Sequence, residues 1–171
     1  MIFVIWEAAA AAYTAGMATA ADRQKAFEFL SNHRVASLAT VSAEGAPMSA
    51  VIYYVPDKDL NILFLTKTET AKYINICNNH RVSLAIYDEA NLSTIQIEGT
   101  AAEVSQTYTV DKVFKSIVKR PGELPHWPPP IIKMLAGDAV VMKITPSRLR
   151  FADFRQTKPA SQQNYFTMII P

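Results

Sequence analysis

Residues 60–84 read LNILFLTKTETAKYINICNNHRVSL. An apolar run ends at Thr66, a cluster of threonines and lysines follows, and a second apolar run begins at Val82. This order predicts a strand, a hydroxyl-rich turn that opens a helix ending at Asn78, and a further strand. The first turn of a helix has free backbone N–H groups and the positive end of the helix dipole. Hydroxyls and lysines there predict a phosphate site, with the alternative that the threonines are only caps and the lysines only solvated.

The composition describes a globular domain. Of the 171 residues, 50% are hydrophobic and 19% are charged, which is enough apolar material for one domain with a core. This apolar surplus favours a subunit interface, so we expect a homodimer. The formal net charge of +2, without a basic run, does not indicate a nucleic-acid partner. The one cysteine, Cys77, excludes a disulfide scaffold and predicts a reducing, cytoplasmic location.

The chain divides into three parts. Residues 1–18 form an apolar, alanine-rich N-terminal extension, 19–155 form the main domain, and 156–171 form a C-terminal tail or interface arm. The extension lacks the basic start of a secretory signal and is too short to cross a bilayer, so no membrane partner is expected. It is either a peripheral helix or precedes a true start at Met17.

Hydrophobic alternation and turn residues predict a mainly β fold. Gly99 lies inside a predicted strand, where it indicates a bulge or sharp bend of the kind that barrel closure needs. Short strands without a long βαβ crossover favour a small antiparallel barrel of six or seven strands. The predicted strands span 35–41, 47–55, 60–66, 81–87, 93–104, 139–145 and 148–154, with a turn at 146–147, and the predicted helices span 19–32, 68–78 and 111–118.

Five motifs in this order resemble the pyridoxamine 5′-phosphate oxidase-like proteins, the FMN-binding split barrels. The resemblance covers roughly residues 33–154. The motifs are RVASLATV at 34–41 followed by GAP at 45–47, FLT at 64–66, Thr70-Ala71-Lys72 in place of the family's Ser-x-Lys phosphate element, NHRVSL at 79–84, and IEGTA at 97–101.

The resemblance implies a flavoprotein oxidoreductase that acts on a small-molecule substrate. It implies a homodimer with FMN at the interface, its phosphate held at the start of the helix and its ring lying along the second strand. The implied cofactor-binding residues are Thr66, Lys67, Thr70 and Lys72 for the phosphate, Ser49, Ala50, Val51, Ile52 and Tyr53 beside the ring, and Gln96 at its polar edge. The catalytic residues and the substrate are not implied.

Several positions depart from the vitamin B6 oxidases of that family. Ala50 and Ala71 stand where those enzymes carry arginines, and Ser93-Thr94 replaces their Arg-Gln pair. Their Arg-x-His element has no match near the C-terminus, although Arg155 lies in the corresponding region. These departures argue against oxidation of pyridoxamine phosphate itself and predict weaker FMN binding.

Other residues leave alternatives open. His126 and Trp127 lie in a proline-rich stretch that either covers the flavin as a lid or packs on the barrel. His80 and His126 would be the ligands if the barrel were instead a non-catalytic haem-binding protein. A non-catalytic flavin-binding protein and a deazaflavin-dependent reductase are the remaining alternatives, and no histidine spacing suggests a metal site.

Overall fold

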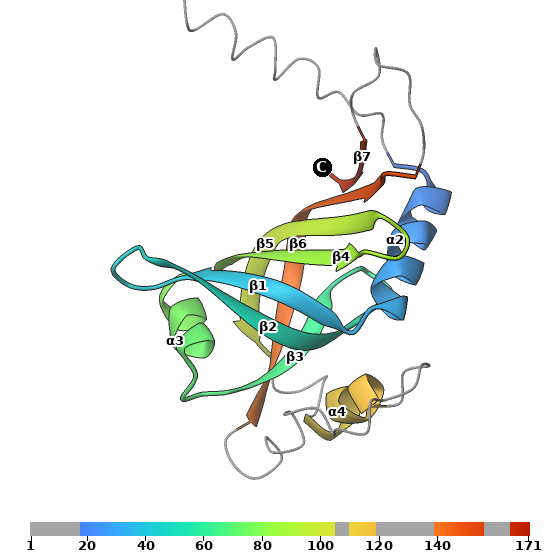
Figure 1. Ribbon diagram of the computed structural model, residues 1–171. Helices are drawn as coiled ribbons and strands as arrows, with labels where there is room; N and C mark the ends of the chain where they lie inside the picture. Colours follow the sequence, from blue (N-terminus) through green and yellow to red (C-terminus); the bar gives the residue numbers. More distant parts are fainter. Residues whose placement is uncertain (1–17, 105–109, 119–138, 156–164) are drawn as a thin grey trace, which may run out of the picture.

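The computed structural model describes residues 18–104, 110–118, 139–155 and 165–171, which form a mainly β fold with three helices (Figure 1). In chain order the elements are α2 (Ala20–Asn32), β1 (Val35–Val41), β2 (Pro47–Pro56), β3 (Ile62–Lys67), α3 (Ala71–Asn78), β4 (Arg81–Asp88), β5 (Ser93–Glu103), α4 (Val110–Val118), β6 (Ala139–Asp153) and β7 (Phe166–Ile170).

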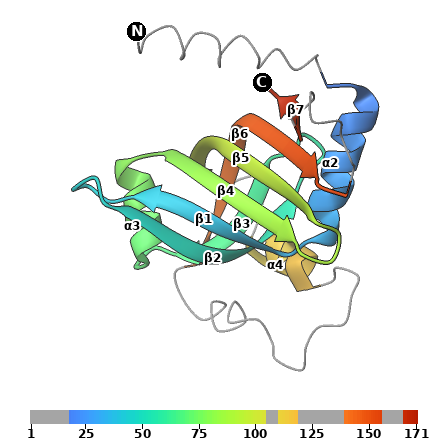
Figure 2. The same ribbon diagram turned by 45° about the horizontal axis from the view of Figure 1, so that its top comes forward.

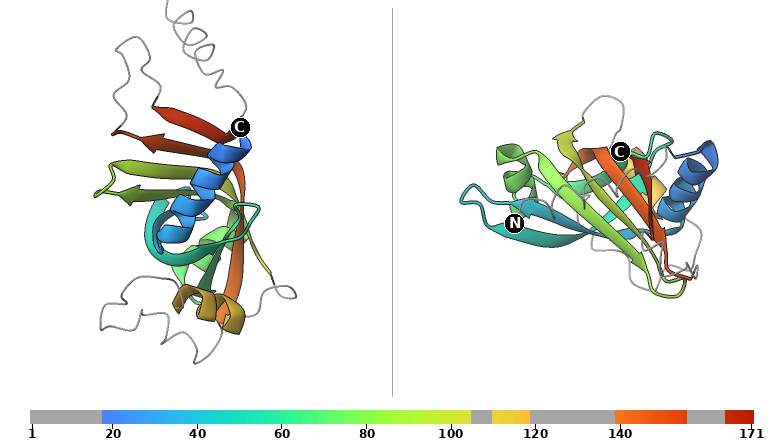
Figure 3. Two further views of the ribbon diagram at one scale, coloured as in Figure 1. Left: turned by 90° about the vertical axis from the view of Figure 1, so that its right-hand side faces the viewer. Right: turned by 90° about the horizontal axis from the view of Figure 1, so that it is seen from above.

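The strands form one antiparallel sheet that closes on itself. Their order is β3-β2-β1-β4-β5-β6-β7, and β3 also pairs with β6, so six strands make a barrel and β7 adds to the outside of β6. Helix α2 lies across one end of the barrel and α3 lies at the other (Figures 2 and 3). The predicted split barrel of six to seven strands is confirmed.

The barrel interior is filled by every second residue of the strands. Strands β1 and β4 show a strict exposed-buried alternation, which places Leu38 and Leu84 inside. Helix α2 closes its end of the barrel with Phe29 and Leu30. Fully buried Tyr54 donates a hydrogen bond from its hydroxyl to the Leu30 carbonyl oxygen at 3.2 Å, which ties the helix to β2.

A second apolar cluster lies outside the barrel. Helix α4 packs Val113 and Ile117 against Leu63 and Leu65 of β3 and against neighbouring residues of β2 and β6. Strand β3 is therefore covered on both faces, which explains why its sequence is a continuous apolar run instead of an alternation.

Strand β6 corrects the sequence prediction. The predicted turn at 146–147 between two strands is wrong, because β6 runs unbroken from Ala139 to Asp153. Its ladder with β5 shifts register between Glu98 and Gly99, where Pro146 lies opposite Gly99. A Cβ on Gly99 would collide with the Thr145 carbonyl oxygen and lie 3.1 Å from the Pro146 Cα. The bend predicted at Gly99 is confirmed, and it accommodates a proline that would otherwise interrupt the ladder.

Two elements start two or more residues later than predicted. Strand β3 begins at Ile62 and not at residue 60, because the chain is still in a turn at Leu60, which has a φ of 67°. In this turn the Asp57 carboxylate accepts a hydrogen bond of 2.9 Å from the Asn61 N–H. Helix α3 begins at Ala71 and not at residue 68. Helix α2 follows the prediction, with Thr19 as its N-cap in a capping box.

The chain ends contribute one further strand. Residues 166–170 of the predicted C-terminal arm form β7, which pairs with the last part of β6. The N-terminal extension predicted at 1–18 lies outside the described residues except for Ala18. Within the described ranges, no helix has the length and apolarity needed to span a membrane.

Candidate functional site: the start of helix α3

The turn before α3 is held by its threonine hydroxyls. Thr70 donates from its hydroxyl to the Lys67 carbonyl oxygen at 2.8 Å, and its backbone N–H donates to the same oxygen at 3.1 Å. Thr66 and Thr70 place their hydroxyl oxygens 2.8 Å apart. Either hydroxyl can donate in this bond, since the Thr66 hydroxyl also lies 3.5 Å from the Lys67 carbonyl oxygen. Both hydroxyls thus close the turn.

This arrangement leaves the start of α3 uncapped. Thr70 is the N-cap, but its side chain makes no capping hydrogen bond to the helix. Within the described part of the chain, the N–H groups of Ala71, Lys72 and Tyr73 therefore have neither an intrahelical acceptor nor a side-chain cap. The first turn also carries no acidic residue, in contrast to α2 with Asp22 in its capping box. Free donors and the positive end of the helix dipole make this an anion-binding end.

Lys72 adds a positive charge at the same place. Its side chain is half-buried, and burial lowers the pKa of its ammonium. Within the described residues no carboxylate lies within ion-pair distance of it, whereas Lys67 pairs with Glu69 at 3.6 Å. A partly desolvated cation without a partner is costly, and an anion placed beside it would remove that cost.

Helix α3 is anchored on both sides. Buried Asn75 donates from its side-chain amide to the Thr40 hydroxyl on β1 at 3.1 Å and lies 3.9 Å from the Met48 sulfur on β2. Tyr73 donates from its hydroxyl to a carboxylate oxygen of Glu103 on β5 at 2.9 Å, which raises the pKa of Tyr73 to about 12. Sequence reasoning allowed Tyr73 to pack against the barrel but did not identify Glu103 as its partner. It missed the Asn75 anchor, although Asn75 is a lone polar residue between the apolar positions Ile74 and Ile76.

The residues predicted beside a flavin ring lie on an exposed sheet face. Ser49 and Val51 point outward from β2, with Val51 70% exposed, and Ile52 points into the core. The Ser49 hydroxyl lies 2.8 Å from that of Ser37 on β1. Ala50 and Tyr53 are half-buried, and Tyr53 packs at the edge of the α4 cluster.

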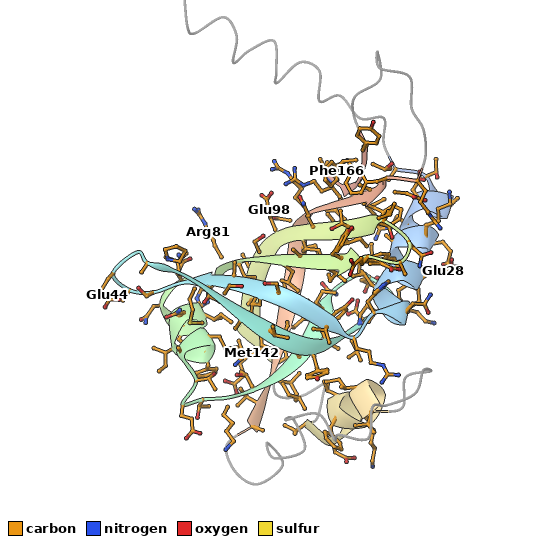
Figure 4. The ribbon with its side chains drawn as sticks, in the orientation of Figure 1. Glu28, Glu44, Arg81, Glu98, Met142 and Phe166 are labelled. Atoms are coloured by element: carbon orange, nitrogen blue, oxygen red, sulfur yellow. The ribbon has the colours of Figure 1, made fainter. Side chains whose placement is uncertain are left out.

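The outer surface of β2, β1 and β4 carries mostly small side chains. We term it the small-residue face. Exposed Val35 and Tyr87 add apolar area to it at 44% and 58% exposure, and Glu98 and Arg81 project from the same side of the sheet at its rim (Figure 4). It comprises Ser49, Val51, Val35, Ser37, Ala39, Ser83, Ala85 and Tyr87.

Gln96 lies in line with this face. The strand registers pair Val51 with Ser37, Ser37 with Ala85, and Ala85 with Gln96, so all four lie in one row across the sheet. Gln96 is half-buried and separated from β2 by two strands.

Arg155 lies elsewhere. Its guanidinium donates hydrogen bonds of 3.0 and 2.9 Å to the Asp153 carboxylate and one of 3.2 Å to the Asn91 side chain. These bonds hold the pKa of Asp153 below its ordinary value. The group follows β6 at the α2 end of the barrel, so the structure does not bring Arg155 together with Lys72.

The histidine candidates are also placed. His80 is exposed after α3, and its carbonyl oxygen accepts from the Ala101 N–H at 2.8 Å. His126 and Trp127 lie outside the described residues. In the part of the chain that is described, no cluster of histidine, cysteine and carboxylate side chains could hold a metal ion.

Comparison with known proteins agrees with this fold. Residues 23–153, most of the chain, match the family pyridoxamine 5′-phosphate oxidase. No curated protein matches the sequence.

Solved structures share the fold at low sequence identity. The conserved hypothetical protein Rv2991 of Mycobacterium tuberculosis is 22% identical over 86% of this chain and 97% of its own, with a TM-score of 0.65. A candidate pyridoxamine 5′-phosphate oxidase of Listeria innocua is 22% identical over 75% of this chain and 96% of its own, at 0.59. The heme storage protein HutZ of Vibrio cholerae is 19% identical over 74% and 91%, at 0.57. The family match and the shared barrel together place the chain in the pyridoxamine 5′-phosphate oxidase-like split-barrel family.

Proposed function

We propose that this protein is a homodimeric, FMN-dependent oxidoreductase that acts on a small organic molecule. The observation that carries the proposal is the half-buried Lys72 ammonium, which has no ion-pair partner among the described residues, beside the uncapped start of α3. The terminal phosphate of FMN is a dianion that accepts hydrogen bonds on three oxygens, so it satisfies both the cation and the free N–H donors.

The residues at α3 fit this group in a specific division of roles. Lys72 would supply the charge, and the N–H groups of Ala71 and Tyr73 would supply donors. Thr66 is fully buried, so it would act only by orienting the Thr70 hydroxyl. When bound, FMN would supply the hydride chemistry, while the chain supplies binding, orientation and shielding from water.

The small-residue face supports the dimer. Its exposed valines and tyrosine are interrupted only by serine and alanine, so a flat partner can approach the backbone closely. We propose that a second copy covers this face and that the isoalloxazine ring lies between the copies, beside Ser49, Ala50, Val51, Ile52 and Tyr53, with Gln96 at its polar edge.

The departures from the vitamin B6 oxidases shape the proposal. With Ala50 and Ala71 in place of two arginines, Lys72 would be the main cation on the phosphate. We therefore expect FMN binding to depend strongly on Lys72, and we do not propose pyridoxamine phosphate as the substrate. The same two alanines disfavour the longer, more anionic deazaflavin cofactors.

A spectrum of the purified protein tests the proposal. Protein mixed with FMN and freed of excess ligand should retain a flavin spectrum. Lys72→Ala should weaken binding by about 1.5–3 kcal/mol, the range for a hydrogen bond to a charged group. Lys58→Ala, an exposed lysine in the turn before β3, is the matched control and should bind normally.

Two outcomes would contradict the proposal. Equal FMN affinity for the wild type and Lys72→Ala would remove Lys72 from the site. Absence of retained flavin, with a Soret band after haem addition, would favour a haem-binding protein, and His80→Ala would then test the exposed histidine as a ligand.

A further inference from the structure

A cavity separates α2 from the strands β6 and β7, at the end of the barrel opposite α3. Its volume is about 420 Å³, and its walls come from α2 on one side and from the end of β6 and the start of β7 on the other. Glu28, which lines it, projects from α2 on the side of the molecule away from α3 (Figure 4). Pockets of roughly 300–1,000 Å³ are the usual size for small ligands.

The helix wall of the cavity carries alternating charges. Asp22, Lys25 and Glu28 follow one another at intervals of three residues, which places them along one stripe of α2. Asp22 uses its Oδ2 to accept from the Thr19 N–H and hydroxyl, at 3.0 and 2.7 Å. Glu28 uses its Oε1 to accept from Gln24 at 2.9 Å. Among the described residues, each carboxylate thus keeps one oxygen without a hydrogen bond.

Lys25 is the cation of this wall, and its side chain is exposed. Among the residues that the structure describes, its ammonium makes no ion pair and no hydrogen bond, although it lies close enough to Asp22 and Asp153 to contribute to lowering the pKa of both carboxylates. The ammonium can therefore accept an incoming anionic group without first breaking a bond.

The strand wall is neutral and partly aromatic. The opposite charges of Asp153 and Arg155 cancel, because two hydrogen bonds join the carboxylate to the guanidinium. Phe151 packs edge-on against Phe29 with ring centroids 5.5 Å apart, and both rings line the cavity together with Tyr165. This side carries no net charge, and its accessible aromatic surface comes from Phe151 and Tyr165, because Phe29 is only 8% exposed.

We propose that this cavity binds a small zwitterion with a primary ammonium, a carboxylate and an aromatic side group, the chemistry of an aromatic amino acid. Its ammonium would bind the remaining oxygens of Asp22 and Glu28, its carboxylate would bind Lys25, and its ring would lie against Phe151 and Tyr165. A simple anion would face two carboxylates for one ammonium, and a simple amine would leave Lys25 without a partner. The zwitterion is the ligand class that complements all three charges.

This site is independent of the proposed flavin site, so each can fail without the other. The probes are L-phenylalanine, phenethylamine, which lacks the carboxylate, and 3-phenylpropionate, which lacks the ammonium. Binding is followed by amide chemical-shift titration of the full-length protein. We expect L-phenylalanine to cause saturable shifts around Lys25, Phe151 and Thr167, with weaker binding of both analogues.

Two exposed substitutions assign the charges. Lys25→Gln should weaken L-phenylalanine binding about tenfold and leave phenethylamine unchanged, because it removes only the carboxylate partner. Glu28→Gln should weaken both, and Lys58→Gln should weaken neither. The proposal is overturned if L-phenylalanine gives no saturable shifts, if the shifts map elsewhere, or if phenethylamine binds the wild type as tightly as L-phenylalanine. Since Lys25 and Glu28 are exposed, the variants should keep the wild-type spectrum outside the cavity.

Discussion

Asn75 of α3 and Thr40 of β1 form a buried side-chain hydrogen bond of 3.1 Å between residues that are 35 positions apart. The bond attaches the candidate phosphate helix to the strand that runs beside β2. The orientation of the uncapped helix start relative to the small-residue face therefore depends on this pair.

We expect Asn75→Ala to destabilise the protein by about 1–3 kcal/mol, because the Thr40 hydroxyl loses its partner in a buried position. Thr40→Val should cost a similar amount, since it leaves the Asn75 amide unsatisfied. Urea unfolding of both single variants and the double variant measures the coupling. Strictly additive losses would show that the two side chains do not act as a pair.

Gly99→Ala should destabilise the barrel by about 1–3 kcal/mol or prevent folding, because the new methyl group collides with backbone and not with a flexible side chain. Gly45→Ala is the comparison. Gly45 has a φ of 84° but open space around its Cβ position, so only the backbone strain of about 1–2 kcal/mol applies there. Thermal unfolding separates the two, and a smaller loss at Gly99 than at Gly45 would contradict the bulge geometry.

The Tyr73–Glu103 bond predicts a pH dependence in the alkaline range. The hydrogen bond to Glu103, followed by the neighbouring Cys77, raises the pKa of Tyr73 from 10.0 to about 12. The stabilisation is therefore fully present below pH 10 and is lost as the pH rises through 12. The difference in tyrosinate absorbance between the wild type and Tyr73→Phe reports this titration. Glu103→Gln should move it towards pH 10, and an unchanged midpoint would exclude Glu103 as the cause.

Much of the fold could be predicted because its signals are local. The alternation in 35–41 and 81–87, the capping residues Thr19 and Asp22, and the bend at Gly99 each reflect the residues of one element. The continuity of β6 through Pro146 could not be predicted, since it depends on pairing with β5, more than forty positions earlier in the chain.

The candidate site, like the fold, could be predicted only in part. The threonine–lysine cluster was visible in the sequence, and the structure places Thr66, Lys67, Thr70 and Lys72 in one turn and helix start. What the sequence could not show is that Thr66 is fully buried and that Thr70 turns its hydroxyl away from the helix. The Thr70 orientation follows from its bonds to the Lys67 carbonyl oxygen and the Thr66 hydroxyl, which only the folded turn brings together.

The Lys72 ammonium should lower the stability of the flavin-free protein while it strengthens the binding of FMN. Burial lowers its pKa, so the folded, flavin-free protein disfavours the charged ammonium relative to the unfolded chain. The contribution of Lys72 to the free energy of unfolding is therefore least favourable at pH values below the pKa of Lys72 in the folded protein. This contribution becomes more favourable as the pH rises from there towards 10.5, the ordinary pKa of lysine. Lys72→Met, which keeps the aliphatic stem, should raise the free energy of unfolding of the flavin-free protein at neutral pH. The gain should be below about 1 kcal/mol, because solvent screens a half-exposed charge.

The same variant should bind FMN more weakly than the wild type, so the two effects have opposite signs. Urea unfolding with and without FMN measures both in one experiment. A variant that loses both stability and binding would show that Lys72 supports the fold, and one that loses neither would place the phosphate elsewhere. The opposite signs distinguish a binding residue that is costly to the free protein from a residue that only packs.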